Sequence, residues 1–294
     1  MAELRFFMTD VFAIGKHSGN QLATVLHDGS MPSDEMQQVA AEFGFSETTF
    51  IMEQEPVNGG YPVRIFTPKA EVDFAGHPAL GTAYILRQYV IRQPVDRVVL
   101  NLKVGQIPVC CPSVGDDVLW MRQNQPRLEH GIDPKTMASV IGLDQDALDP
   151  RWPISQVTTG LPFTIVPVRS LDALRKARVD LDQYAAWSQT VWAKGLLVFC
   201  LDGYTSLQDL ATRVFVPYLG ILEDPATGSG SGCLAAYLLH HRCLESEAID
   251  ICVGQGYEID RPSEIFIRAS LSGDAFSIDV GGRVVEIASG NLLA

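Results

Sequence analysis

A five-residue pattern occurs twice in this chain, with about half of the chain length between the copies. Residues 64–68 read RIFTP and residues 213–217 read RVFVP, an offset of 149 residues (213 minus 64) in a chain of 294. The same offset aligns Gly81 with Gly230. Chance similarity is the alternative, but the elements expected around the two copies also follow in the same order. The chain is therefore predicted to contain a duplication.

Each half contains one segment that is expected to form a helix buried on all sides. Residues 74–86 read FAGHPALGTAYIL, and residues 223–239 read EDPATGSGSGCLAAYLL. Both join an apolar helix to a turn of small residues, and the surrounding segments alternate in the manner of strands. The predicted fold is α+β, with two similar domains that each have a mostly antiparallel sheet around one central helix. Such domains would meet along a cleft, where small ligands tend to bind.

Composition and charge exclude several classes of function. The formal net charge is −13, which argues against sequence-independent binding of nucleic acid or of an anionic membrane surface. The amino-terminal residues lack a secretory signal pattern, and no segment has eighteen uninterrupted apolar residues. The six cysteines include no CxxC pair and are typical of reduced core thiols. We therefore expect a cytoplasmic protein.

No metal site is expected from the sequence. The neighbouring residues His240 and His241 lie in the second apolar helix, where successive side chains point about 100° apart. Two such histidines cannot share an ion as an i, i+4 pair does.

The starts of the two apolar helices are candidate anion-binding sites. A helix amino terminus carries unpaired N–H groups and a partial positive charge, and it can receive a carboxylate without help from Lys or Arg. Gly228, Gly230 and Gly232 would let a ligand approach the backbone of the second helix. Close packing of another element is the alternative reason for these glycines. Ser229 and Ser231 supply polar groups that packing alone does not need, which favours a ligand.

Glu47 is the candidate acid–base residue. The offset of 149 residues aligns Glu47 with Leu196, so one half has a carboxyl group at a position that is apolar in the other half. An ordinary exposed glutamate at a strand start is the alternative. If the side chain lies in a dry cleft, desolvation would raise its pKa toward neutrality, which suits a group that takes and returns a proton. His77, at the start of the first helix, is either a structural residue or a donor to a substrate oxygen.

Five motifs together resemble a known family. They are Gly19-Asn20, SET at 46–48, RIFTP at 64–68, FAGHP at 74–78 and EDPATGS at 223–229. In this order they look like the PhzF-like family of phenazine biosynthesis isomerases, within the diaminopimelate epimerase-like fold. The resemblance covers nearly the whole chain. It implies two pseudosymmetric domains, each a mostly antiparallel barrel-like sheet around a central helix, and it implies a homodimer that requires no cofactor.

The resemblance also implies domain bounds. The amino-terminal domain is expected to span 1–125 and the carboxy-terminal domain 126–279, with the last strand, near 280–294, returning to the first domain.

The resemblance implies roles for particular residues. In the phenazine enzyme of the family, a glutamate at the SET position moves a proton within trans-2,3-dihydro-3-hydroxyanthranilate, and Glu47 occupies that position. His77, Asp224 and Ser229 correspond to residues that contact the substrate. The backbone at Gly76 and Gly228 is implied nearby. The expected partner is thus a small anionic carboxylate, with Glu47, His77 and Asp224 as the catalytic residues.

Two departures leave other functions open. Related racemases and epimerases of this fold use a cysteine at each helix start, where this chain has Ala75 and Pro225, and Cys233 lies too far along the helix to replace them. Asp73 stands where the phenazine enzyme has proline, which puts the substrate in doubt. The alternatives are epimerisation or isomerisation of another small amino or hydroxy acid, and a non-catalytic protein that keeps the site for ligand binding.

Overall fold

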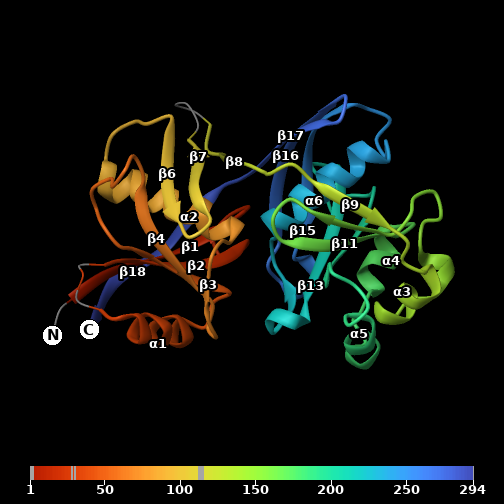
Figure 1. Cartoon of the computed structure of the whole chain (residues 1–294), viewed down its shortest axis with the longest axis horizontal. Helices are drawn as coiled ribbons and strands as arrows, with labels where there is room; N and C mark the ends of the chain where they lie inside the picture. Colours follow the sequence, from red (N-terminus) through yellow and green to blue (C-terminus); the bar gives the residue numbers. More distant parts are fainter. Residues whose placement is uncertain (1–2, 28, 30, 112–115, 294) are drawn as a thin grey trace. The chain divides into compact units, whose positions relative to one another are not determined.

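The computed structural model describes residues 3–27, 29, 31–111 and 116–293 (Figure 1). The contacts within the chain divide it into two compact units. Unit 1 comprises Met1–Met121 and Gly281–Ala294, and unit 2 comprises Arg122–Val280. Among the described residues, no helix is both long and apolar enough to span a membrane.

Unit 1 consists mainly of strands around one buried helix. Its strands are β1 (Glu3–Val11), β2 (Asn20–Leu26), β3 (Glu47–Ile51), β4 (Tyr61–Phe66), β5 (Glu71–Val72), β6 (Arg97–Leu102), β7 (Gly105–Cys110), β8 (Leu119–Arg122) and β18 (Val284–Leu293). Its helices are α1 (Ser33–Phe43) and α2 (Gly76–Ile85), and α2 continues into a π-helical turn (Leu86–Ile91). Strand β1 pairs antiparallel with both β2 and β18, β2 pairs parallel with β3, and β3 pairs antiparallel with β4.

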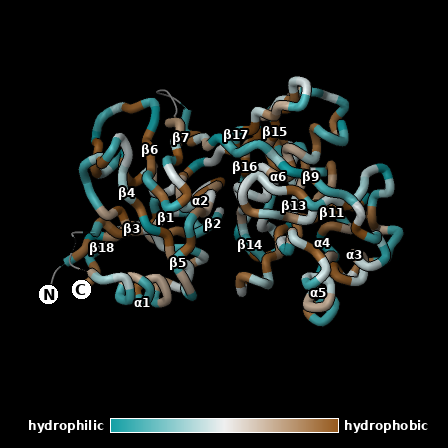
Figure 2. The backbone as a smooth tube through the Cα atoms, in the orientation of Figure 1, coloured by the Kyte–Doolittle hydropathy of each residue, from teal (hydrophilic) through white to brown (hydrophobic). Residues whose placement is uncertain are grey.

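The helices of unit 1 differ in burial as their sequences predict. Figure 2 shows hydrophilic and hydrophobic residues mixed along α1, which buries Met36 and Ala40 and leaves its other face exposed. In contrast, nine of the ten residues of α2 are buried. Gly81 permits this packing, because a Cβ atom there would lie 2.5 Å from Cδ2 of Leu22.

Unit 2 also has a buried helix among strands, and it carries additional short helices. Its strands are β9 (Arg127–His130), β10 (Ser155–Thr158), β11 (Pro162–Pro167), β12 (Gly195–Cys200), β13 (Leu210–Val216), β14 (Ile221–Asp224), β15 (Ala248–Gln255), β16 (Ser263–Ser272) and β17 (Ala275–Gly282). Its α-helices are α3 (Pro134–Val140), α4 (Leu171–Lys176), α5 (Leu181–Trp187) and α6 (Gly228–His240), and its 3₁₀ turns are Gln145–Ala147, Pro217–Leu219 and Tyr257–Ile259. Twelve of the thirteen residues of α6 are buried.

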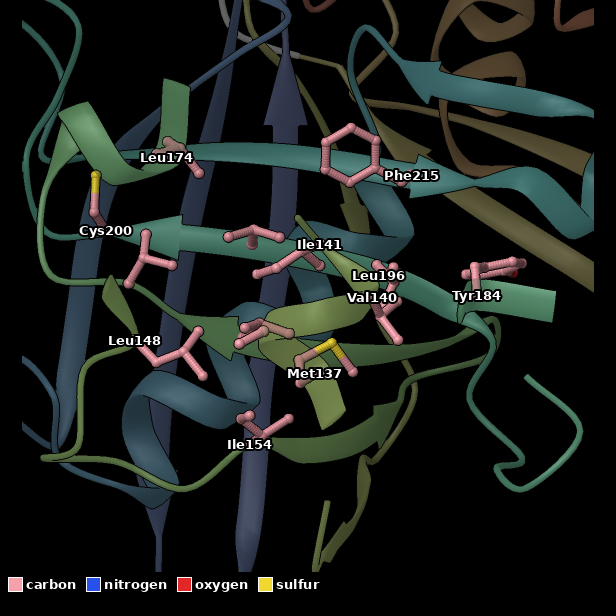
Figure 3. Packing of buried hydrophobic residues seen from close by; sticks show 14 of the residues in the cluster. Met137, Val140, Ile141, Leu148, Ile154, Leu174, Tyr184, Leu196, Cys200 and Phe215 are labelled. Carbon is pink, nitrogen blue, oxygen red and sulfur yellow. The ribbon is translucent and has the colours of Figure 1, made fainter. Parts of the chain in front are cut away.

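The core of unit 2 includes a cluster between the short helices and the strands. Met137 of α3 and Ile141, the C-cap residue of that helix, pack with three other residues (Figure 3). These are Leu174 of α4 and Leu196 and Phe215 of the strands. The prediction of a mixed α and β fold is confirmed. The pseudosymmetry of two domains stays a prediction.

The repeated R-x-F-x-P pattern has the same local structure in each unit. On a strand, side chains two residues apart share a face, and the guanidinium carbon of Arg64 lies 5.0 Å from the ring centroid of the phenylalanine two residues later. The corresponding distance for Arg213 is also 5.0 Å. Each arginine makes two hydrogen bonds to one glutamate, Arg64 to Glu71 and Arg213 to Glu223. The pattern therefore encodes an arginine held between an aromatic ring and a carboxylate.

Candidate active site

Glu47 and His77 lie together in unit 1. Glu47 is the first residue of β3 and pairs with Leu22 of β2, whereas His77 is the second residue of α2. The Oε2 atom of Glu47 is 3.4 Å from Nε2 of His77, and their side chains are 15% and 7% exposed. Gly76, the first residue of α2, directly precedes His77 in the chain. Two of the predicted site residues are thus in contact, and both are mostly removed from water.

The imidazole of His77 is neutral at pH 7. Burial lowers the pKa of His77 from 6.5 to about 3, and a weaker backbone hydrogen bond with Gln21 acts in the opposite direction. The contact with Glu47 is therefore not a pair of opposite charges. Nε2 of His77 makes no hydrogen bond to any described residue, so the bond with Gln21 belongs to Nδ1. A bond that raises the pKa is one that the ring donates, and this leaves the lone pair of Nε2 directed at Glu47.

A set of buried threonine hydroxyl groups fixes α2 against the strands beside the pair. Thr82 Oγ1 of α2 donates to Thr49 Oγ1 of β3 at 2.8 Å, and Thr24 of β2 lies 3.0 Å from the same oxygen. Thr82 follows His77 by somewhat more than one helical turn, and Thr49 lies two residues beyond Glu47. These bonds hold the helix and the strand that carry the two site residues in one register.

The low pKa of His77 predicts a specific pH dependence of stability. The unfolded chain protonates His77 near pH 6.5, while the native state does so only near pH 3. Stability from the neutral ring is therefore fully present above about pH 6.5 and is lost as the pH falls toward 3. Between pH 7 and pH 5, the wild-type free energy of unfolding should fall by about 2 kcal/mol more than that of a His77→Asn variant. Urea titrations at both pH values measure this difference, and equal losses in the two proteins would contradict a buried neutral His77.

Asp224 is held by neighbouring polar groups in unit 2. It is the last residue of β14 and is buried, and the hydroxyl group of Thr227 donates a hydrogen bond to its carboxylate. Nε2 of Gln255 donates to the backbone oxygen of Asp224 at 2.8 Å and to Thr227 Oγ1 at 3.1 Å. The bond from Thr227 orients the Asp224 carboxylate, while Gln255 holds Thr227 and the backbone of Asp224.

The first turn of α6 follows Asp224 directly. The helix begins at Gly228, its N-cap residue is Thr227, and no side chain caps it. Ser229 is buried in this turn. The N–H groups of an uncapped first turn remain available to an anion. Asp224, Gly228 and Ser229 thus lie at or next to the start of α6, and their role in binding stays a prediction.

Two of the glycines in α6 are explained by packing within unit 2. A Cβ atom at Gly232 would lie 2.9 Å from the side chain of Gln123 and 3.0 Å from Thr159 Oγ1. At Gly230 it would lie 3.1 Å from Cδ1 of Leu197. The packing alternative accounts for these two positions, and only Gly228 remains a candidate for close approach of a ligand.

Cys233 does not have the properties of an acid–base thiol. It is fully buried in α6, its Sγ donates to the backbone oxygen of Leu161 at 3.5 Å, and burial raises its pKa to about 12. This agrees with the expectation that Cys233 does not replace the cysteines of the related racemases.

Sequence reasoning missed the residues that orient the site. Thr227 lay within the EDPATGS motif and could have been found there. Gln255, at the end of β15, and the threonines of β2, β3 and α2 carried no signal in the sequence, because their partners lie on other elements.

The chain resembles known proteins along almost all of its length. A family model described as "Phenazine biosynthesis-like protein" (PhzC-PhzF) matches residues 9–290. A relative from Pseudomonas aeruginosa, named trans-2,3-dihydro-3-hydroxyanthranilate isomerase, is 31% identical over 290 residues, covering 97% of this chain and 98% of the relative. An uncharacterized isomerase from Mesorhizobium japonicum is 28% identical over 304 residues, covering 99% of each chain. The solved structure of a phenazine biosynthesis protein of the PhzF family from Bacillus anthracis matches with a TM-score of 0.91 and 27% identity, over 100% of both chains.

Proposed function

Because this chain belongs to the phenazine biosynthesis-like (PhzC-PhzF) family of isomerases, we propose that it moves a proton within a small unsaturated carboxylate, with Glu47 as the general acid and base. The observation that carries the proposal is the contact between Glu47 and the neutral ring of His77 in a mostly buried position. A positioned carboxyl group of this kind typically contributes about 10²- to 10⁴-fold to a proton-transfer rate.

The proposed reaction is a proton shift between two carbons. The carboxylate of Glu47 removes a C–H proton beside a conjugated carbonyl or alkene, and the electron pair of that bond spreads into the conjugated system. The protonated Glu47 then returns the proton to a different carbon on the same face, which forms the isomer and restores the carboxylate. His77, whose Nε2 faces Glu47, positions the carboxyl group and can accept a hydrogen bond from it once Glu47 holds the proton.

We assign the residues of unit 2 to substrate binding. The N–H groups at Gly228 and Ser229 would receive the substrate carboxylate, and they would stabilise negative charge as the C–H bond breaks. Asp224, oriented by Thr227 and Gln255, would accept a hydrogen bond from a substrate hydroxyl or amino group. The backbone at Gly76 is a second candidate contact. In this proposal the two units are the two domains of a duplication.

The homodimeric state and the cytoplasmic location expected from the sequence are part of the same proposal. Sedimentation of the purified chain tests the homodimeric state, since a monomer at micromolar concentration would contradict a homodimer.

The relative from Pseudomonas aeruginosa provides the first substrate to test. We expect the purified protein to change the ultraviolet spectrum of trans-2,3-dihydro-3-hydroxyanthranilate with time, with that relative as the positive control. In D₂O the product should contain less than a full equivalent of solvent deuterium, because Glu47 returns part of the proton that it removed. Complete labelling of the product with solvent deuterium would contradict direct return of the proton by Glu47.

No change in the ultraviolet spectrum, together with turnover by the relative, would overturn this choice of substrate. A panel of amino and hydroxy acids followed by NMR in D₂O then separates another isomerase or epimerase from a ligand-binding protein.

A further inference from the structure

Three histidines gather at one place in unit 2 that the proposed reaction does not use. They are His130, His240 and His241, which are half of the six histidines in the chain. Their ligand nitrogen atoms all lie within 4.8 Å of one another. His130 and His240 are exposed, and His241 is half-buried.

The end of α6 brings His240 and His241 together. The sequence prediction that they point apart assumes that both are helical, but α6 ends at His240, and His241 is the capping residue with φ −91° and ψ 0°. The two rings are perpendicular, with centroids 4.8 Å apart. The ligand nitrogens of these adjacent residues nevertheless lie within 4.8 Å of each other, and the expectation that they do not share an ion stays a prediction.

Strand pairing supplies the third histidine. His130, the last residue of β9, pairs with Ser155 of β10, and β10 packs against α6. The ring of His130 is 5.7 Å from that of His240 and 5.2 Å from that of His241. The position of His130 is thus set by the strand register and not by a mobile loop.

Ser155 orients the ring of His130. Ser155 Oγ donates to the backbone oxygen of Pro153 at 3.2 Å and lies 2.8 Å from His130 Nδ1. The same oxygen lies 3.5 Å from His241 Nε2. Because Ser155 engages Nδ1 of His130, a metal would meet this ring through Nε2, which carries the lone pair in the tautomer whose Nδ1 donates. A hydrogen bond from the other ring nitrogen is the usual arrangement around a metal-binding histidine.

We propose that His130, His240 and His241 form a binding site for a divalent transition-metal ion of the Zn²⁺ class. Imidazole is a preferred ligand of Zn²⁺, Cu²⁺ and Ni²⁺. Tetrahedral Zn²⁺, with Zn–N distances of about 2.0–2.1 Å, requires nitrogens about 3.3 Å apart. Side-chain rotation at the exposed His240 would bring the nitrogens closer while His130 keeps its bond to Ser155, and water would complete the coordination.

The position at the end of α6 favours a cation and indicates a structural role. A helix carboxy terminus carries a partial negative charge. Gly228 and His240 are the first and last residues of α6. The metal would therefore lie roughly 18 Å from the substrate-binding turn at the other end of the same helix. An ion held there would join β9 to α6 and stabilise unit 2.

Calorimetric titration of the full chain with ZnCl₂ tests the proposal. The protein should carry no polyhistidine tag and should first be treated with a chelator. We expect one equivalent of Zn²⁺ to bind with a micromolar or lower Kd and to raise the melting temperature, because the ion binds the native state. Replacement of an exposed ligand, in His130→Gln or in His240→Gln, should weaken Zn²⁺ binding by at least about 10-fold. Ser155→Ala should weaken it by about 10- to 100-fold while leaving the three ligands in place.

The matched control is His17→Asn, which removes an exposed histidine of unit 1 and should leave the Kd unchanged. Absence of saturable binding by the wild-type protein overturns the proposal. So does binding that survives in the folded His130→Gln and His240→Gln variants. Circular dichroism spectra of all variants separate a lost ligand from a lost fold.

Discussion

Replacement of Glu47 with glutamine is expected to abolish turnover while ligand binding is retained. Glutamine has nearly the same shape as glutamate but cannot take a proton from carbon, so the rate should fall by about 10²- to 10⁴-fold or more. The side chain at position 47 is 15% exposed beside the neutral ring of His77, and an amide N–H can donate to the lone pair of Nε2. The variant should therefore fold normally. Steady-state rates on a substrate that the wild-type protein accepts, together with calorimetric binding of that substrate, measure the two effects.

Glu42→Gln is the matched control for this experiment. Glu42 is exposed on α1 and has no proposed role, so its replacement should change neither rate nor binding. Turnover by Glu47→Gln at the wild-type rate would remove Glu47 from the mechanism. Loss of both binding and turnover in a folded variant would instead assign Glu47 to substrate binding.

The largest loss of stability is expected from Arg213→Leu. Arg213 is 2% exposed, and it donates to both carboxylate oxygens of Glu223 and to the backbone oxygens of Leu174, Arg175 and Ala177. Leucine would leave Glu223 as a buried charge without its partner, together with three carbonyl groups that have lost a donor. Breaking a buried ion pair from one side costs about 3–5 kcal/mol. The free energy of unfolding from urea titration should fall by that amount, and a loss below about 1 kcal/mol would contradict this assignment.

The repeated pattern provides the control within the same chain. Arg64→Leu removes the corresponding arginine of unit 1, whose side chain is 26% exposed. Its partner Glu71 also lies 2.9 Å from Lys103 Nζ. Because water and Lys103 continue to stabilise the carboxylate, the loss should be only about 1 kcal/mol. Equal losses in the two variants would show that burial does not distinguish the two copies of the pattern.

The sequence predicted the parts of the candidate site that depend on local structure. Small residues before an apolar run locate the starts of α2 and α6, and these starts place His77 and Ser229. Comparison of the two halves identified Glu47 because a carboxyl group replaced leucine at an otherwise apolar position. The structure then puts Glu47 and His77 in contact. The helix starts can be identified from the sequence because they depend on residues adjacent in the chain, whereas Glu47 was identified from the internal repeat.

The parts that were not predicted depend on distant segments. Gln255 reaches Asp224 only because β15 runs beside β13, on which β14 folds back. The glycine at 232 was interpreted as room for a ligand, whereas Gln123 occupies that space. The grouping of His130 with His240 requires both the register of β9 on β10 and the residue at which α6 ends. Spacing along one sequence contains none of this information.

The pairing of β1 with β18 has a consequence for biosynthesis. These are the first and last strands of the part of the chain that the structure describes, and they pair from Glu3 opposite Leu293 to Val11 opposite Val284. On the ribosome, unit 2 is complete as soon as Val280 has emerged, whereas one edge of β1 lacks its partner until the final strand is made. The carboxy-terminal unit can thus finish folding first, and a nascent chain that stalls or is truncated before β18 presents an open strand edge on which other chains can aggregate.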